Sequence, residues 1–200
     1  MRSVILKPSP RCGACQLPPR WCTCAALEPV RCPLRIDLLI HSRERFRPSS
    51  TGNLISRVFP ESRRHIWSQH VKPSAADLVD PERETWILHP HGRPPPADAD
   101  PGRVQVVLLD GAWHETADMA RAVSGWGRPV SLPLSGSSRY WLRSQQEGRR
   151  FSTAEALLYV LEGFHLGAAR DALRLQFDLH VYAHLRARGR LERSEEHTSV

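Results

Sequence analysis

Four cysteines lie within thirteen residues near the start of the chain. Cys12, Cys15, Cys22 and Cys24 follow the pattern C-x2-C-x6-C-x-C. Four thiolates are the usual ligand set of a structural zinc ion, and they also hold iron–sulfur clusters. The remaining interpretation is four unrelated thiols, since a reducing compartment argues against disulfides. We predict a structural Zn²⁺, which leaves no open coordination position and therefore does no chemistry. The fifth cysteine, Cys32, is then a free thiol.

A carboxylate stands at the end of a strongly apolar segment. Asp110 follows residues 104–109 (VQVVLL), a run typical of a strand buried on both faces. In open α/β sheets the ligand binds beyond the carboxyl ends of the strands. Asp110 could act there as a general base, and Gly111 would let a ligand approach the backbone closely. The alternative interpretation is that Asp110 caps the next helix and that Trp113 belongs to the core.

Two further segments follow predicted strands. Residues 41–52 and 89–92 leave such strands, so in a parallel sheet they would meet Asp110 at one edge. Residues 135–143 (SGSSRYWLR) combine aromatics with arginines, which suits stacking on bases and contact with phosphates. A turn followed by half-buried aromatics would produce the same composition, and the charged residues of 41–47 could equally be a solvated loop.

Hydrophobic periodicity indicates the elements that must position these residues. Short apolar runs predict strands at 34–40, 65–69, 85–88, 104–109 and 129–132, and helical spacing predicts helices at 51–59, 113–123, 152–164 and 168–188. Ser152 and Glu155 form the pattern of a capping box at the start of the third of these helices. Three prolines, Pro94 to Pro96, predict that residues 89–100 are an irregular loop.

The alternation of strands and helices predicts an α/β fold with a mostly parallel sheet and flanking helices. We expect three parts: a cysteine-rich zinc knob at 1–33, an α/β catalytic domain at 34–188 and a disordered tail at 189–200.

The charge is uneven. The net charge is +7, and residues 1–60 carry ten Arg or Lys against three Asp or Glu. A basic surface attracts polyanions such as nucleic acid, although coding bias would also explain the abundance of arginine. No apolar run reaches the roughly 18 residues that a membrane span needs, and the first residues lack a secretory signal. We therefore expect a cytoplasmic protein without a membrane partner.

These pieces, in this order, resemble the DTW-domain family of tRNA-uridine aminocarboxypropyltransferases. The resemblance covers about residues 10–185 and begins with the four cysteines. It continues through His41-Ser-Arg-Glu44, Ser50-Thr51-Gly52 with Leu54, Leu88-His-Pro90, Leu109-Asp110-Gly111-Ala112-Trp113, Ser138-Arg-Tyr140 with Leu142-Arg143, Ser152-Thr153 and Glu155-Ala156. Each motif is weak alone, but six in order are specific.

The resemblance implies a fold related to the SPOUT superfamily, with a knot in the C-terminal part, which is an exception to the usual rules of chain topology. It implies S-adenosylmethionine as the donor, a 3-amino-3-carboxypropyl group as the group transferred, N3 of a tRNA uridine as the acceptor and methylthioadenosine as the by-product.

The site residues follow from the same resemblance. Asp110 would be the base or would orient the uracil edge. The donor pocket would contain Leu88, His89, Pro90, Gly92, Asp110, Gly111, Trp113, Ser138 and Tyr140, and the tRNA phosphates would contact Arg43, Arg45, Arg47, Arg139 and Arg143.

Ala112 departs from the family pattern, because the signature has threonine at this position. Loss of a helix cap would cost about 1 kcal/mol, whereas loss of a substrate contact would reduce activity. Two alternatives therefore stay open: a SPOUT-type RNA methyltransferase, and a zinc-stapled RNA-binding module without catalysis.

Overall fold

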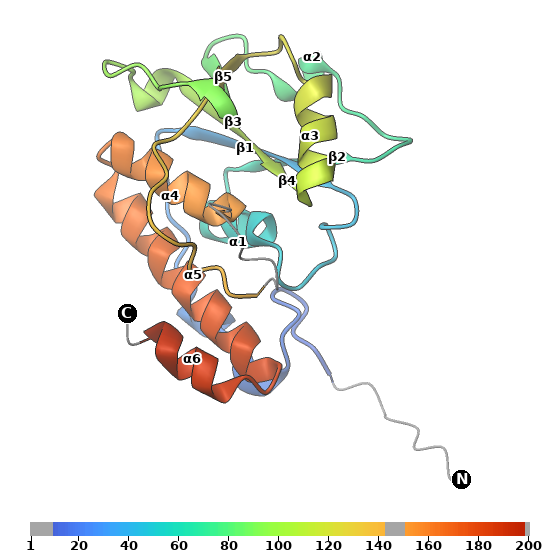
Figure 1. Ribbon diagram of the computed structural model, residues 1–200, viewed down its shortest axis with the longest axis vertical. Coiled ribbons are helices and arrows are strands. Elements are labelled where there is room, and N and C mark those ends of the chain that lie inside the picture. The colour runs from blue at the N-terminus through green and yellow to red at the C-terminus, as the bar shows by residue number, and fades with distance from the viewer. Residues whose placement is uncertain (1–9, 143–150, 199–200) are drawn as a thin grey trace.

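A five-stranded parallel sheet forms the centre of the protein, in a computed structural model that describes residues 10–142 and 151–198. Its strand order is β2-β1-β4-β3-β5, and every pairing is parallel (Figure 1). The strands are β1 (Arg35–His41), β2 (Arg63–Trp67), β3 (Glu84–Arg93), β4 (Val104–Asp110) and β5 (Arg128–Val130). Because β1 and β4 lie inside the sheet, their side chains are buried on both faces, as the apolar run 104–109 predicted.

Helices cover both faces of the sheet. The helices are α1 (Thr51–Val58), α2 (Ala75–Leu78), α3 (Trp113–Ala122), α4 (Thr153–Gly163), α5 (Gly167–Ala187) and α6 (Leu191–Thr198), with 3-10 turns η1 (Pro19–Trp21), η2 (Cys24–Ala26) and η3 (Pro101–Arg103). Leu38 and Leu108 belong to a core cluster with residues of α1, α4 and α5, whereas Leu39 and Val107 belong to another with Met119 of α3. These helices lie on opposite sides of the sheet (Figure 1). Each such buried side chain contributes about 1.5–3 kcal/mol relative to exposure.

Most predicted elements are confirmed within a few residues, but β3 is longer than expected. Residues 89–93 were predicted as a loop because of the prolines at 94–96, yet they continue the strand to Arg93. The prolines come only after the strand has ended. A register shift between Leu88 and Arg93 accommodates Pro90, and Arg93 still pairs with Val130 of β5. The prediction failed because β5 supplies a partner that the local sequence does not reveal.

The prediction of a disordered tail at 189–200 is wrong for its described part. Residues Leu191–Thr198 form α6, which lies beside α5. Its buried side chains are Ser194 and His197, and His197 packs edge-on against Trp141. Because α6 is held by contacts of polar side chains with distant residues, apolar periodicity in the sequence did not predict this helix.

The helices of the described ranges 10–142 and 151–198 include none that is both long and apolar enough to cross a membrane.

Candidate functional site

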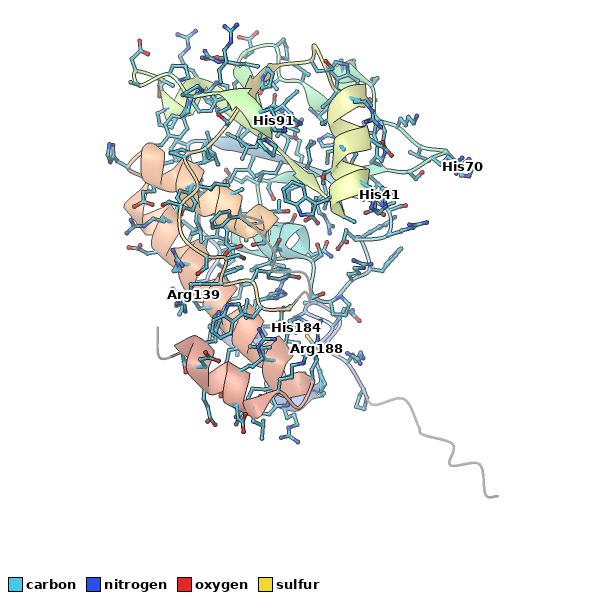
Figure 2. All side chains as sticks on the ribbon, in the orientation of Figure 1. His41, His70, His91, Arg139, His184 and Arg188 are labelled. Carbon is cyan, nitrogen blue, oxygen red and sulfur yellow. The ribbon has the colours of Figure 1, made fainter. Side chains whose placement is uncertain are left out.

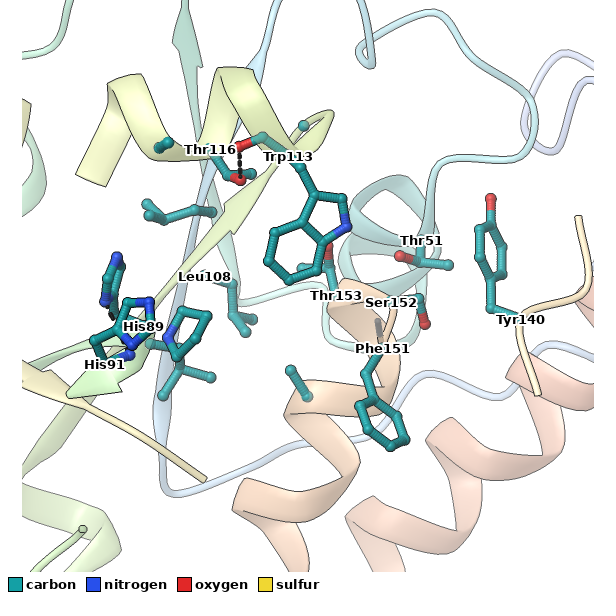
Figure 3. Close-up of a pocket in the computed structure, with 16 residues that line it drawn as sticks. Thr51, His89, His91, Leu108, Trp113, Thr116, Tyr140, Phe151, Ser152 and Thr153 are labelled. Carbon is teal, nitrogen blue, oxygen red and sulfur yellow. Dashed lines mark hydrogen bonds between the residues drawn. The ribbon is translucent and has the colours of Figure 1, made fainter. Parts of the chain in front are cut away.

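A pocket of about 320 Å³ opens at the carboxyl ends of β3 and β4 (Figure 3). This volume lies within the range of small-molecule sites. The lining residues come from β3, β4, the first turns of α1, α3 and α4, and the segment before α4: Thr51, Leu88, His89, Pro90, His91, Leu108, Leu109, Gly111, Trp113, Thr116, Ala117, Tyr140, Phe151, Ser152, Thr153 and Ala156. The parallel sheet therefore brings the predicted loops to one place, as such sheets do.

Trp113 forms one wall of this pocket. It is the first residue of α3, the residue is 48 % exposed, and its indole faces the cavity from the side opposite His89 (Figure 3). Burial, with a smaller contribution from the neighbouring charge of His91, lowers the pKa of His89. An exposed aromatic face and a neutral imidazole give this pocket stacking and hydrogen-bonding groups without added charge.

Asp110 lies behind the pocket wall rather than in it. Its side chain is buried, with Oδ2 accepting from the Ser50 hydroxyl at 2.9 Å and Oδ1 accepting from the Thr153 hydroxyl at 2.6 Å. Gly52 permits this approach, since a Cβ there would stand 2.6 Å from Asp110 Oδ2. Asp110 thus links the starts of α1 and α4, and within the described residues the Thr153 hydroxyl connects its carboxylate to the cavity lining.

The start of α3 lacks a side-chain cap. Ala112 occupies the N-cap position and has no side-chain acceptor for the backbone N–H groups of the first turn. The other half of a capping box is present, because the Ala112 N–H donates to Glu115 Oε2 at 2.8 Å. Glu115 Oε1 also lies 3.2 Å from His41 Nδ1 and 3.5 Å from Arg43 Nη1.

Glu155 holds the segment before α4 against the rest of the site. It accepts from the Ser138 hydroxyl at 2.9 Å, from the Arg139 backbone N–H at 2.7 Å and from the Ser152 N–H at 2.7 Å. The predicted capping box of Ser152 and Glu155 is present. Ser138 therefore fastens this segment to α4, while Tyr140 lines the pocket and its hydroxyl donates to the Ser49 carbonyl at 2.5 Å.

The predicted pocket residues divide into two groups. Those that line the cavity are Leu88, His89, Pro90, Gly111, Trp113 and Tyr140, whereas Gly92, Asp110 and Ser138 do not line it. Gly92 instead meets β5, where a Cβ would stand 2.5 Å from the Val130 backbone.

Several lining residues were not among the predicted site residues, including Thr51, Thr116, Phe151 and Thr153. The adjacent hydroxyls of Ser50-Thr51 and Ser152-Thr153 were the available signal for two of them.

The predicted RNA-contacting arginines also divide. Arg43, Arg45 and Arg47 lie exposed on the loop after β1, where Arg47 pairs with the buried Glu44 at 2.6 Å. Arg139 is engaged inside the fold, since its Nη2 donates to the His197 carbonyl at 2.8 Å and its Nε lies 3.5 Å from Asp178. Figure 2 shows Arg139 beside α5, away from His91. Arg143 lies outside the described residues.

The four clustered cysteines have the geometry of a metal centre. Their Sγ atoms all lie within 4.8 Å of one another, and the Cys12–Cys24 and Cys15–Cys22 Sγ distances are both 3.7 Å. A tetrahedron with metal–sulfur bonds of about 2.3 Å has sulfur–sulfur edges of roughly 3.8 Å. The four thiols are therefore close enough to bind one metal ion such as zinc.

Local hydrogen bonds and burial act on these thiols in opposite directions. Hydrogen bonds from the backbone N–H groups of Cys15 and Ala14 lower the pKa of Cys12 to about 6, and burial raises the pKa of Cys24 to about 12. The cluster packs against α5 through Leu17 and Ala183. Arg57 of α1 donates to Cys24 Sγ at 3.8 Å, so the metal centre is joined to the helix that starts at the pocket.

Comparison with known proteins agrees with the motif pattern. No solved structure matches the chain. The sequence model of the DTW domain matches residues 9–185, which span the metal centre, all five strands and the pocket. The chain therefore belongs to the DTW domain family.

Proposed function

We propose that this protein transfers the 3-amino-3-carboxypropyl group of S-adenosylmethionine to N3 of a uridine in tRNA, forming acp³U and releasing methylthioadenosine. Membership of the DTW domain family is consistent with a tRNA-modifying role. The observation that carries the proposal is the pocket at the carboxyl ends of β3 and β4, whose lining contains the family-matched Leu88, Gly111 and Trp113.

The two ends of the pocket suit the two ends of this donor. Leu88, Pro90 and Leu109 form an apolar wall for the adenosine and its sulfur, and Trp113 offers a ring face for stacking. Thr51 and Thr153 stand in the first turns of α1 and α4, where the positive ends of the helix dipoles favour a carboxylate. The amino acid arm would bind at these helix starts, which aligns its γ-carbon rather than the methyl group with the acceptor.

Asp110 would take the uridine proton through Thr153. The Thr153 hydroxyl donates to Asp110 Oδ1, so its lone pairs can accept the N3–H of a uracil placed in the pocket. As N3 forms its bond to the γ-carbon and the carbon–sulfur bond breaks, the N3 proton would pass to Thr153 Oγ1 and the hydroxyl proton of Thr153 to Asp110. In this proposal Asp110 is the base, and Thr153 is the group that contacts the substrate.

The metal would have a structural role. Four thiolates fill a tetrahedral zinc site, so Cys12, Cys15, Cys22 and Cys24 would hold Zn²⁺ and keep the N-terminal segment on α5. The SPOUT relationship, the C-terminal knot and the cytoplasmic location stay predictions, and residues 143–150, which join the strand region to α4, lie outside the described part of the chain.

Nucleoside mass spectrometry tests the function directly. Unmodified tRNA is incubated with purified protein and S-adenosylmethionine, then digested to nucleosides. We expect acp³U and an equal amount of methylthioadenosine. A methylated nucleoside with S-adenosylhomocysteine would establish the methyltransferase instead. No product and no calorimetric binding of S-adenosylmethionine would establish an RNA-binding module without catalysis.

A further inference from the structure

A second, larger cavity lies on the other side of the start of α1. It is a groove of about 550 Å³ between the loop after β1 and the cysteine-rich N-terminal segment, whose described residues 10–33 we call the metal knob. One wall is Gly13 to Gln16, which carries Cys15 of the metal centre, and the opposite wall is Arg45 to Pro48. The floor includes Ser50, Asn53 and Arg57, whose spacing places them along one side of α1.

Arginine is the most frequent ionisable residue in this groove. Four arginines line it, namely Arg45, Arg47, Arg57 and Arg64, and its lining within the described residues includes the Cys15 thiol but no aspartate or glutamate. Arg47 is paired with Glu44, but within residues 10–142 and 151–198 no carboxylate lies within ion-pair distance of Arg45 or Arg64. An arginine-lined concave surface attracts a chain of phosphates.

The groove also has an aromatic platform. Phe46 is 78 % exposed, which is unusual for so large an apolar side chain, and the Arg45 guanidinium lies 5.1 Å from its ring centre. One ring face is thus covered by a cation, and a base could stack on the exposed ring. Stacking of this kind requires a base that is not paired in a helix.

We propose that this groove binds an unpaired stretch of RNA backbone, with the metal knob as one wall and Phe46 as the stacking platform. The inference rests on the proposed function for the identity of the RNA as tRNA. Eight residues of α1 extend about 12 Å, the length of roughly three or four stacked nucleotides. Ser50 lines the groove and the adjacent Thr51 lines the pocket, so the groove lies close to the proposed catalytic pocket at the start of α1.

A membrane surface is the less suitable partner. Anionic lipid also attracts arginines, but insertion needs a broad apolar face that projects from the protein. Here the arginines line a hollow, and Phe46 is the only large apolar side chain among the lining residues. The groove therefore suits RNA better than a membrane, and in this proposal the metal knob contributes to RNA binding as well as to structure.

The first experiment measures fluorescence anisotropy of a 5′-labelled unmodified tRNA at several salt concentrations. Phe46→Ala is expected to weaken binding by on the order of tenfold, since a stacked base is lost. In a plot of log affinity against log salt concentration, the slope is negative. The double variant Arg45→Gln with Arg64→Gln should reduce the magnitude of this slope by about 1.4, because each phosphate contact contributes about 0.7. Leu175→Ala and Arg103→Gln are the controls, since both residues are exposed and line neither cavity.

The second experiment tests the knob wall itself. Apart from Gly13 and its two chain neighbours, no atom of the described residues lies within 4 Å of a Cβ built at Gly13, so a longer side chain fits there. Gly13→Glu places a negative charge in the groove and should weaken tRNA binding severalfold, whereas Gly13→Gln, of the same shape, should bind like the wild type. Zinc content and calorimetric binding of S-adenosylmethionine should be equal in both variants.

The outcomes distinguish a failure of the groove proposal from a failure of the proposed function. If the wild type modifies tRNA while Phe46→Ala, the arginine double variant and Gly13→Glu all bind tRNA normally, the groove proposal is wrong and the proposed function stands. If these variants lose tRNA binding but the wild type transfers no group, the groove stands and the proposed function is wrong. Loss of binding to phosphatidylserine vesicles with tRNA binding unchanged would overturn the groove proposal in favour of a membrane.

Discussion

At the scale of single residues, Asp110 illustrates how burial changes a role. The carboxylate is enclosed by Ser50, Gly52 and Thr153, and in the described part of the chain the hydroxyl of Thr153 links it to the pocket. An ordinary helix cap would instead accept from the backbone N–H groups of the following turn. The Asp110 carboxylate accepts from two side-chain hydroxyls, which fits a positioned proton acceptor.

Asp110→Asn should reduce kcat by 10²-fold or more, because it removes the final proton acceptor. Thr153→Val should reduce kcat similarly by breaking the relay, while S-adenosylmethionine binding changes little in Asp110→Asn. Rates measured from pH 6 to 10 should recover partly at high pH in both variants, since hydroxide can then take the proton. If Asp110→Asn keeps the wild-type rate, Asp110 is not the base.

Ala112→Thr should stabilise the protein by about 1 kcal/mol. The added hydroxyl can accept from the Glu115 N–H, completing the capping box that the Ala112 N–H and Glu115 already half form. Urea unfolding of the variant and of Ala112→Val, which has a similar shape and no hydroxyl, checks this. Equal stabilisation by valine would contradict a cap, and a change in kcat without a change in stability would place the missing hydroxyl at the substrate.

At the scale of elements, α5 carries two buried histidines against the loop that precedes α1. The rings of His180 and His184 pack edge-to-face with their centres 4.5 Å apart, and His180 Nε2 lies 3.4 Å from the Ser49 carbonyl (Figure 2 labels His184). Burial holds the pKa of His180 well below its usual range and lowers the pKa of His184 to about 4. The nearby positive charges of Arg57 and Arg188 act in the same direction.

These histidines should make the protein sensitive to mild acid. Above pH 6.5 they are neutral in both the folded and unfolded states and have no effect on the pH dependence. As the pH falls below 6.5, the two histidines bind protons in the unfolded chain while they stay neutral in the folded protein. The free energy of unfolding therefore falls until the pH reaches the pKa of the folded state. At pH 5 each histidine should have lowered the free energy of unfolding by about 2 kcal/mol.

Urea midpoints at pH 8 and pH 5 measure this loss. His184→Gln should lose less stability than the wild type between the two values, while the exposed His70→Gln should behave like the wild type. An unchanged pH dependence in His184→Gln would show that other groups govern acid stability.

At the scale of the whole molecule, the metal knob, α1 and α5 form one unit. Leu17 and Ala183 pack together, Gln176 donates to the Ala26 carbonyl at 2.6 Å, and Arg57 reaches Cys24. Loss of the metal should therefore loosen the groove and the packing on α5 together.

Cys22→Ser should abolish the binding of one zinc per chain and lower Tm by at least about 4 °C. Cys32→Ser is the control, since Cys32 lies outside the four-thiol cluster and should leave zinc content unchanged. Metal analysis and thermal unfolding measure the two effects. Purification with iron and visible charge-transfer absorption would instead identify an iron–sulfur cluster.

Features that depend on neighbouring residues could be predicted from the amino-acid sequence. The spacing of Cys12, Cys15, Cys22 and Cys24 predicted the metal centre, since neighbouring residues in tight turns cannot lie far apart. The apolar run 104–109 and the Ser152–Glu155 capping box predicted a buried strand and a helix start, because burial and capping depend on nearby residue types.

Features that depend on distant partners became visible in the folded protein. Strand order placed β4 between β1 and β3, and that order brought Ser50 and Thr153 onto Asp110 across 60 and 43 residues of chain. The extension of β3 needed β5, and α6 needed Trp141. The groove forms between the metal knob and the loop after β1, and no local sequence pattern predicts that these two segments lie together. In each case the free energy comes from contacts between residues far apart in sequence, which periodicity and propensity do not encode.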